Sequence, residues 1–317
     1  MLEIVFKYVG NGDGIVINLD TKKNRVGIID ANRVDGKNPV LDHLVNKKIN
    51  KLEFIFISHP HFDHYSGILE ILDYCESRKI QIKHFGYTTD LNKTILEALN
   101  KNVSRDKLKL LAEIYRKASE LEQSGLINQR VLLTNNSKTY NFSKNSNIAF
   151  LSPTQTERDS YNKSIHSDFE IRDSSSSANI LSLVTIFNLN DEYVLLTSDA
   201  EKSTLERIGI KLLKNDPRNI VLGQIPHHGS LKNHRREFWK RLKYNPQTPL
   251  IISTGPNSHK HPSPTVIDEL NQLDYDVHLT CPVISSKGLS PSYMLNMFST
   301  KAIGSTITNS QDLTYTF

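Results

Sequence analysis

Runs of apolar residues in the first sixty positions predict strands of a buried sheet. Two runs rich in β-branched and aromatic residues, "LEIVFKYV" and "GIVINL", flank the glycine-rich turn "GNGDG", which is typical of two strands joined by a turn. A third run covers residues 25–29 and is followed by Asp30. Residues 52–57, "LEFIFI", are almost continuously apolar, which indicates a strand covered on both faces.

The period of the apolar pattern changes directly after this fourth run. From Tyr65 onward the apolar residues recur at helical spacing, which predicts a helix. The segment "SHPHFDH", from Ser58 to His64, therefore lies at the carboxyl end of a strand. Open α/β sheets tend to bind their ligands at that end of their strands.

The middle of the chain has a different character. Residues 91–123 carry leucine and isoleucine at helical spacing among many Lys and Glu, which predicts one or two amphipathic helices. We interpret them as an inserted layer or lid, with a dimer or protein-partner surface as the alternative. Residues 134–178 are rich in Asn, Ser, Thr and Asp and predict a loop. We expect one domain over residues 1–317, with a helical and loop insertion at about 84–175.

The C-terminal half repeats one arrangement, in which a buried strand is followed by His or Asp. The predicted strands cover residues 180–187, 193–197, 219–225 and 249–255, and the predicted helices cover 201–213 and 234–243. Because the carboxyl ends of parallel strands meet at one edge of a sheet, we expect the polar residues that follow the strands to share one site. These are Asp30, His59 to His64, Asp199, His227, His228, His259 and His261.

Composition narrows the class of protein. The chain of 317 residues is 38% hydrophobic and 23% charged, which predicts a globular protein with a substantial core. The net charge of +5 permits an anionic substrate without requiring one. Two distant cysteines, Cys75 and Cys281, argue against a secreted disulfide framework. Since neither a signal peptide nor an apolar run of about 18 residues is visible, we expect a cytoplasmic protein with no membrane partner.

The residue types at the predicted site favour a metal centre. Imidazole and carboxylate groups suit Zn²⁺ or Mn²⁺, whereas the scarcity of cysteine argues against iron–sulfur or thiolate-zinc sites. The six candidate ligands are His59, His61, Asp63, His64, Asp199 and one of His227 and His228. This number exceeds the needs of one tetrahedral ion, so we predict two divalent ions about 4 Å apart, an arrangement that activates water and offsets charge in an in-line displacement.

A family resemblance appears at these residues. "SHPHFDH" resembles the H-x-H-x-D-H signature of the metallo-β-lactamase superfamily, and Asp30, Asp199 and "PHHGS" follow in the family's order. The resemblance implies an α/β fold, the αββα sandwich. More narrowly, "VGNGDGIVI", "NILSLVTIF", "LLTSD" and "ISTGPNSHKHP" resemble elements of the metallo-hydrolase domain of the competence protein ComEC and its stand-alone relatives. The match covers most of residues 1–75 and 178–290.

The resemblance also implies roles for residues beside the ligands. Asp30 would brace the metal ligands, although a strand-end Asp can also simply begin a turn. The family's usual third histidine of the first metal site is missing, as it tends to be in ComEC-like members, and Asn179 or water would take its place. Ser198 stands where the family usually has glycine. For Asp199, a helix cap is the competing interpretation.

Substrate-facing roles remain for the other polar residues. Adjacent residues of a strand point to opposite faces, so we favour His228 as the ligand and His227 as the group that faces the substrate. His261 would hold phosphate or protonate the leaving group, or else be an ordinary loop histidine. Ser230 and the basic helix "HRREFWKRLK", with Arg235 and Arg236, are predicted to contact phosphate, although basic helices are often only solvated faces.

These observations predict a dinuclear metal-dependent hydrolase. The resemblance favours a phosphodiesterase or nuclease that acts on DNA, RNA or nucleotides through a metal-bound hydroxide, with Asp63, His227 and His261 as catalytic residues. One alternative is an ester, lactone or thioester hydrolase of the same fold. The other is a partner-binding module in which the metal site is secondary.

Overall fold

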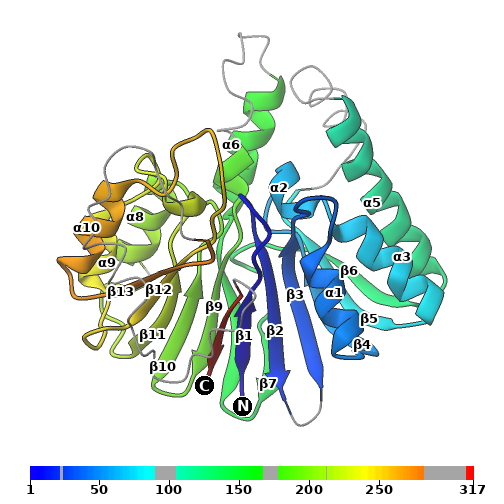
Figure 1. Cartoon of the computed structure of the whole chain (residues 1–317), viewed down its shortest axis with the longest axis horizontal. Helices are drawn as coiled ribbons and strands as arrows, with labels where there is room; N and C mark the ends of the chain where they lie inside the picture. The colour runs from blue at the N-terminus through cyan, green and yellow to red at the C-terminus, as the bar shows by residue number, and fades with distance from the viewer. Residues whose placement is uncertain (22–23, 90–104, 167–177, 212, 282–311) are drawn as a thin grey trace.

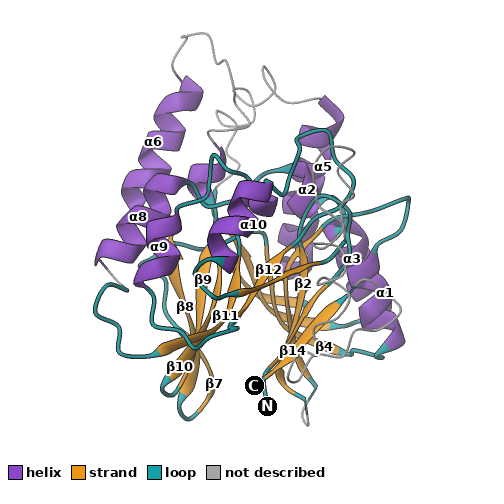
Figure 2. Cartoon of the chain, turned by 60° about the vertical axis from the view of Figure 1, so that its left-hand side comes forward, coloured by secondary structure: helices purple, strands orange, loops and turns teal. Residues whose placement is uncertain are grey.

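The protein is a four-layer sandwich of two sheets between two layers of helices (Figures 1 and 2). The structure is a computed structural model that describes residues 1–21, 24–89, 105–166, 178–211, 213–281 and 312–317. Over these residues each sheet has seven strands. The predicted α/β class and the αββα order of layers are therefore confirmed.

The first sheet has the strand order β14-β1-β2-β3-β4-β5-β6. Strands β1 to β3 pair antiparallel, and β3 to β6 pair parallel. The parallel strands end at the same edge, so the end of β3 lies beside the segment that follows β4. The strands are β1 (Glu3–Phe6), β2 (Gly14–Asp20), β3 (Arg25–Ala31), β4 (Lys51–Phe56), β5 (Gln81–Tyr87), β6 (Ile127–Leu132) and β14 (Leu313–Thr316).

The second sheet has the strand order β13-β12-β11-β10-β9-β8-β7. Strands β10 to β13 are parallel, so the segments that follow β10, β11 and β12 reach one edge together. The predicted hairpin is present, but its first strand begins later than expected, because residues 179–181 form a 3-10 turn. The strands are β7 (Tyr140–Ser143), β8 (Ser146–Ser152), β9 (Val184–Leu189), β10 (Glu192–Leu196), β11 (Asn219–Gln224), β12 (Pro249–Ile252) and β13 (Asp276–Leu279).

Helices cover the outer face of each sheet. Helices α1, α3 and α5 lie over the first sheet, and α8, α9 and α10 lie over the second (Figure 1). The described helices are α1 (Pro39–Asn46), α2 (Phe62–Tyr65), α3 (Ile68–Arg78), α5 (Arg105–Gln123), α6 (Gln155–His166), α8 (Lys202–Lys211), α9 (Arg236–Arg241) and α10 (Pro264–Asn271), with the 3-10 turns η1 (Asn179–Leu181) and η2 (His227–Gly229). In the described part of the chain, no helix combines the length and apolar character needed to cross a bilayer.

Strand β4 shows why the run at 52–57 is almost entirely apolar. Phe54 and Phe56 stack with ring centroids 4.2 Å apart in the core between the two sheets. Leu52 and Ile55 point the other way, into the core between the first sheet and its helices. A strand buried on both faces needs apolar side chains at nearly every position, and the exception, Glu53, pairs with Arg25 (3.0 Å).

The prediction of a loop over residues 134–178 is wrong. This segment forms β7, β8 and α6. Strands β7 and β8 lie at one end of the second sheet, and β8 buries Ile148, Phe150 and Ser152 in strict alternation. A strand near the end of a sheet needs apolar residues on one face only, so its polar composition resembled that of a loop. Residues 84–175 thus supply strands to both sheets, β6 to the first and β7 and β8 to the second.

Within the amphipathic pattern predicted at 91–123, residues 105–123 form helix α5. Leu111, Ile114 and Leu121 of α5 pack into the same core as the buried residues of α3 and of the first sheet. Residues 91–104 lie outside the described residues. The apolar side of α5 is thus used within the chain, and a role of this region as a lid, dimer surface or partner surface stays a prediction.

Candidate metal centre

The segment after β4 brings its histidines together at the edge of the first sheet. His59 and His64 are completely buried. The backbone nitrogen of His61 donates to the carbonyl oxygen of His59 (3.0 Å), and this turn leaves His59 Nε2 2.9 Å from His61 Nδ1. Asp30 fixes the start of the turn, because its Oδ1 accepts a hydrogen bond from the backbone nitrogen of Ser58 (2.7 Å). The rings of His59 and His61 thus lie on the same side of the turn.

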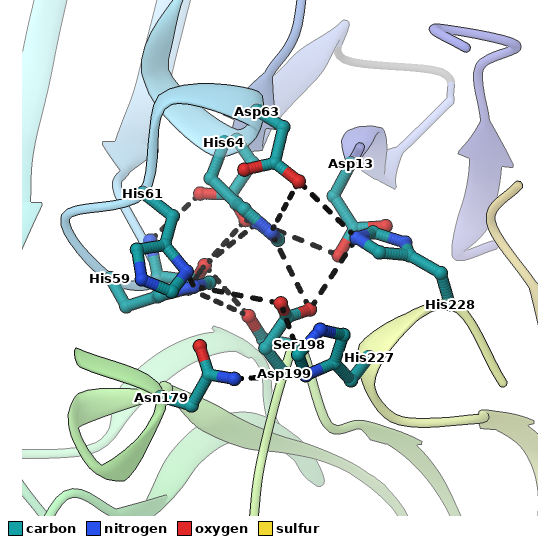
Figure 3. Close-up of polar contacts among 12 residues, drawn as sticks. Asp13, His59, His61, Asp63, His64, Asn179, Ser198, Asp199, His227 and His228 are labelled. Atoms are coloured by element: carbon teal, nitrogen blue, oxygen red, sulfur yellow. Dashed lines mark hydrogen bonds and ion pairs between the residues drawn. The ribbon is translucent and has the colours of Figure 1, made fainter. Parts of the chain in front are cut away.

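Asp199 lies between two groups of these side chains (Figure 3). It follows β10 of the second sheet and is 2% exposed. Its Oδ1 is 3.5 Å from His64 Nε2 and 3.7 Å from His228 Nε2. Its Oδ2 is 3.7 Å from His59 Nε2 and 3.8 Å from His227 Nδ1. One carboxylate therefore faces two separate sets of nitrogens, which is the arrangement of a bridging ligand.

Asp63 lies with the histidines that face Asp199 Oδ1. Its Oδ2 lies 3.5 Å from His228 Nε2 and 4.0 Å from His64 Nε2. The structure thus forms two sets of three ligand-type residues, Asp63–His64–His228 and His59–His64–Asp199. Within each set, the ligand atoms lie within 4.8 Å of one another. These residues are among the predicted metal ligands, and the structure brings all of them together.

Polar atoms without hydrogen-bond partners gather in this cluster. Buried polar atoms are nearly always hydrogen-bonded, so each exception calls for an explanation. Among the described residues, the buried unpartnered atoms of the cluster are Asp13 Oδ1, His61 Nε2, His64 Nε2, Asn179 Oδ1, Asp199 Oδ1 and His228 Nε2. Nitrogen and carboxylate oxygen are donor types that divalent ions bind. The residues therefore fit a metal centre.

Hydrogen bonds behind the imidazoles direct their free nitrogens inward. His64 Nδ1 donates to Asp30 Oδ2 (2.7 Å), and His228 Nδ1 donates to the carbonyl oxygen of Ser253 (2.9 Å). Because both acceptors are oxygens, the Nδ1 atoms carry the protons and the Nε2 atoms can bind metal. Asp13, Asp30 and His64 also lie within 4.8 Å of one another, but they meet at this protonated nitrogen and support the cluster from behind.

Burial and charge act in opposite directions on these groups. Burial raises the pKa of Asp199, but the charges of His64 and His228 outweigh it and hold that pKa well below its ordinary value. Burial lowers the pKa of His228, but Asp199 and Asp63 outweigh it and raise the pKa to about 9. Asp199 and Asp30 likewise raise the pKa of His64 well above its ordinary value, against the effect of burial. In the metal-free chain these shifts favour the doubly protonated, positively charged form of both imidazoles.

Metal binding is accordingly expected to strengthen as the pH rises from 7 toward 9. The extra proton on His228, whose pKa is about 9, must leave before Nε2 can bind a metal ion. When one proton is displaced, the metal affinity rises about tenfold for each unit by which the pH increases, until the pH reaches that pKa. Titration calorimetry with Mn²⁺, in buffers of different ionisation enthalpy, measures the affinity and the number of protons released. A dissociation constant that does not change between pH 7 and 8 would contradict this expectation.

His227 and His228 differ in position as predicted, but the predicted reason is wrong. Both lie in the turn η2 with positive φ angles of 49° and 53°, so they are not adjacent residues of a strand. His228 is buried in the cluster, whereas the His227 side chain is 27% exposed. Asn179 Nδ2 donates to His227 Nδ1 (2.8 Å), which leaves the proton of the ring on Nε2. Asn179 thus contacts His227, and its own Oδ1 is one of the unpartnered atoms.

The remaining predicted residues divide into two groups. The ring of His261 lies beside that of His227, with centroids 5.5 Å apart, and burial followed by the charge of His227 lowers the pKa of His261 to about 4. Ser230 is buried, and its carbonyl accepts hydrogen bonds within the turn after η2. Arg235 and Arg236, expected to contact phosphate, pair with the acidic side chains Glu206 (2.9 Å) and Glu237 (3.8 Å), and their contact with phosphate stays a prediction.

Comparisons with solved structures find similar folds at low sequence identity. The metallo-β-lactamase fold protein YhfI from Bacillus subtilis is 10% identical, with 88% of this chain and 96% of that chain covered and a TM-score of 0.48. Zn²⁺-bound PqqB from Methylobacterium extorquens is 8% identical, with 88% and 98% covered and a TM-score of 0.47. A diphosphatase of the PhnP family is 10% identical, with 88% and 94% covered and a TM-score of 0.45. No protein-family model and no curated protein matches the sequence.

Two residues of the cluster region escaped the sequence analysis. Asp13 is 1% exposed, and its Oδ2 lies 3.7 Å from His64 Nδ1. Gln224 is 2% exposed and donates to Asp13 Oδ2 (2.9 Å). The sequence offered an indication for Asp13, which is an acidic residue in the turn "VGNGDGIVI" between two predicted strands. Gln224 had none, because a glutamine at the end of an apolar strand has no characteristic partner.

Proposed function

We propose that the chain is a dinuclear metal-dependent hydrolase that cleaves phosphodiesters in DNA, RNA or nucleotides. The observation that carries the proposal is the position of Asp199, whose two oxygens face two sets of histidine nitrogens. His59 and His61 would bind one ion and Asp63, His64 and His228 the other, with Asp199 shared. Zn²⁺ and Mn²⁺ both suit this set of ligands. We also propose that the chain is related to the ComEC-like metallo-hydrolases and that residues 1–317 form a single domain.

The chemistry divides between the ions and the chain's own residues. Two bound divalent ions supply Lewis-acid stabilisation of phosphoryl oxygens and a water-derived nucleophile at neutral pH. His227 sits at the outer side of the cluster with its Nε2 proton available, because Nδ1 accepts from Asn179 (2.8 Å). This nitrogen can donate a hydrogen bond to a phosphoryl oxygen. To protonate a leaving group, the ring would first have to take up a second proton at Nδ1, in place of the hydrogen bond from Asn179. Its neighbour His261 is half-buried and stays neutral at pH 7, so it binds through hydrogen bonding and not through charge.

The preference for phosphate rests on the surroundings of the cluster. The chain has a net charge of +5, which favours the approach of an anionic substrate. Two imidazoles, His227 and His261, lie side by side at the more exposed side of the cluster. Arg235 keeps a buried Nε without a partner among the described contacts. We include Ser230, Arg235 and Arg236 as substrate contacts in the proposal, although both guanidinium groups also pair with acidic side chains.

A substrate panel tests the proposal. The purified chain, loaded with Zn²⁺ or with Mn²⁺, is incubated with single-stranded DNA, duplex DNA, RNA, cyclic nucleotides and bis-p-nitrophenyl phosphate. We expect hydrolysis of at least one phosphodiester that is absent after chelation. A carboxylate ester, a lactone and a thioester serve as the comparison. Turnover of these compounds without turnover of any phosphodiester would overturn the substrate assignment in favour of an ester hydrolase.

A further inference from the structure

Gln224 is a buried polar residue that joins the two sheets beside the candidate metal centre. It is the last residue of β11, and its Oε1 accepts hydrogen bonds from the backbone nitrogens of Thr197 (3.1 Å) and Ser198 (3.0 Å). These two residues lead from β10 directly to Asp199. An amide nitrogen cannot accept a hydrogen bond, so the two donors determine which way the Gln224 amide is turned.

The amide nitrogen of Gln224 is thereby directed at the first sheet. It donates to Asp13 Oδ2 (2.9 Å), in the turn between β1 and β2. The backbone nitrogen of Asp13 donates to the carbonyl oxygen of Asp63 (3.2 Å), and Asp13 Oδ2 is 3.7 Å from His64 Nδ1. A continuous set of contacts therefore runs from the loop that carries Asp199, through Gln224 and Asp13, to the segment that carries Asp63 and His64.

This link matters because the ligand-type residues come from both sheets. Hydrogen bonds between strands fix positions within each sheet, and among the described strands none pairs one sheet with the other. The spacing between Asp199 and the segment His59 to His64 therefore depends on contacts across the interface. One is a backbone hydrogen bond from the nitrogen of Leu183 to the carbonyl oxygen of Ser58 (3.0 Å), and the Gln224 link is a side-chain contact of this kind. Ser198 Oγ, which donates to Ser58 Oγ (2.8 Å), is a second contact of this kind.

We propose that Gln224 is a positioning residue of the metal centre. It holds the Asp199 loop at the distance from Asp63 and His64 at which one carboxylate can serve both groups of ligands. Gln224 acts through Asp13 and through backbone nitrogens, and it contacts neither a metal ion nor the substrate. This inference rests on the proposed metal-dependent function, and its primary readout is metal affinity.

Three variants test the inference. Gln224→Met removes both hydrogen-bonding ends at similar length, and Gln224→Glu keeps the acceptor but places a carboxylate against Asp13. In the double variant Gln224→Glu, Asp13→Asn, the hydrogen bond is reversed and the net charge is that of the wild type. We expect each single variant to bind the second equivalent of Mn²⁺ or Zn²⁺ about 10–100-fold more weakly. The double variant is expected to recover most of this loss.

Calorimetric titration and the absorption spectrum of the Co²⁺-substituted chain provide readouts besides activity. With substrate, kcat is expected to fall while KM changes little, because Gln224 does not face the substrate. The matched control is Tyr315→Phe, which removes a different contact between the sheets, the hydrogen bond from Tyr315 to His278 Nδ1. This control is expected to lower the melting temperature without changing metal affinity.

The outcomes separate this inference from the proposed function. If the Gln224 variants are only less stable, with the metal affinity and Co²⁺ spectrum of the wild type, Gln224 is structural and the inference is overturned. If the wild type binds two ions but cleaves no phosphodiester, the substrate assignment falls. In that case, weaker binding of the second ion by both single variants would still support the inference.

Discussion

Asp199→Asn is expected to reduce kcat by more than about 100-fold. Residues that merely support a metal ligand typically cost 10–100-fold when replaced, and Asp199 faces both groups of nitrogens directly. Its Oδ1 approaches His64 and His228, and its Oδ2 approaches His59 and His227. Asparagine keeps the shape of the side chain, but one of its two ends becomes an NH₂ group that cannot bind a metal ion. One group of ligands would therefore lose its shared member.

Steady-state kinetics on whichever phosphodiester the panel identifies measures the effect, and atomic emission measures the metal content. We expect about one ion per chain to be lost, with KM little changed. Asp216→Asn is the matched control, because Asp216 precedes the opposite end of β11 and pairs with Arg218 (2.6 Å). An Asp199→Asn variant with wild-type kcat and two bound ions would contradict the bridging role.

Removal of divalent ions is expected to abolish hydrolysis and to lower the free energy of unfolding. A ligand that binds only the folded chain stabilises it by about 2.7 kcal/mol at 100 times its dissociation constant. The metal-free chain is nevertheless expected to stay folded. Positively charged His64 and His228 would compensate the charges of Asp63 and the buried Asp199, because the pKa values of both histidines are raised. Urea unfolding in EDTA, and then with saturating Zn²⁺ or Mn²⁺, measures the difference.

The double variant Asp63→Ala, Asp199→Ala is the control for this experiment, and its stability should not respond to metal. The same variant separates a hydrolase from a partner-binding module. A hydrolase loses its biological effect with these two carboxylates, whereas a binding module keeps it. Equal stability of the wild-type chain with and without metal would argue against the centre itself.

The sequence predicted those parts of the fold in which the pattern of residues is compatible with only one environment. The almost continuous apolar run of β4 fits a strand between two covered faces, and the H-x-H-x-D-H segment favours a metal site. Strands β7 and β8 were missed because a strand near the end of a sheet tolerates polar residues. The start of β9 was misplaced because Leu181 is buried in the turn η1 as fully as a strand residue would be.

The predicted site shows the same division. All six predicted ligands lie together in the structure. Their positions after predicted strands had indicated that they would reach one edge of the sheets. Gln224 could not be found from sequence, since its role depends on a partner in the other sheet. Arg235 and Arg236 show the converse limit. Their charge was visible in the sequence, but the partner of Arg235, Glu206 of α8, is brought to it only by the fold.

The distribution of the ligands over two sheets has a consequence for how the chain folds. Ser58 and Ser198, which touch beside the centre, are 140 positions apart in the sequence. Contacts of such long range form late, because the entropy of closing the intervening loop must be overcome first. During synthesis the N-terminal half would present His59, His61 and Asp63 long before Asp199 exists. A complete two-ion centre would therefore be one of the last features to form, and its presence would report that both halves had folded and docked.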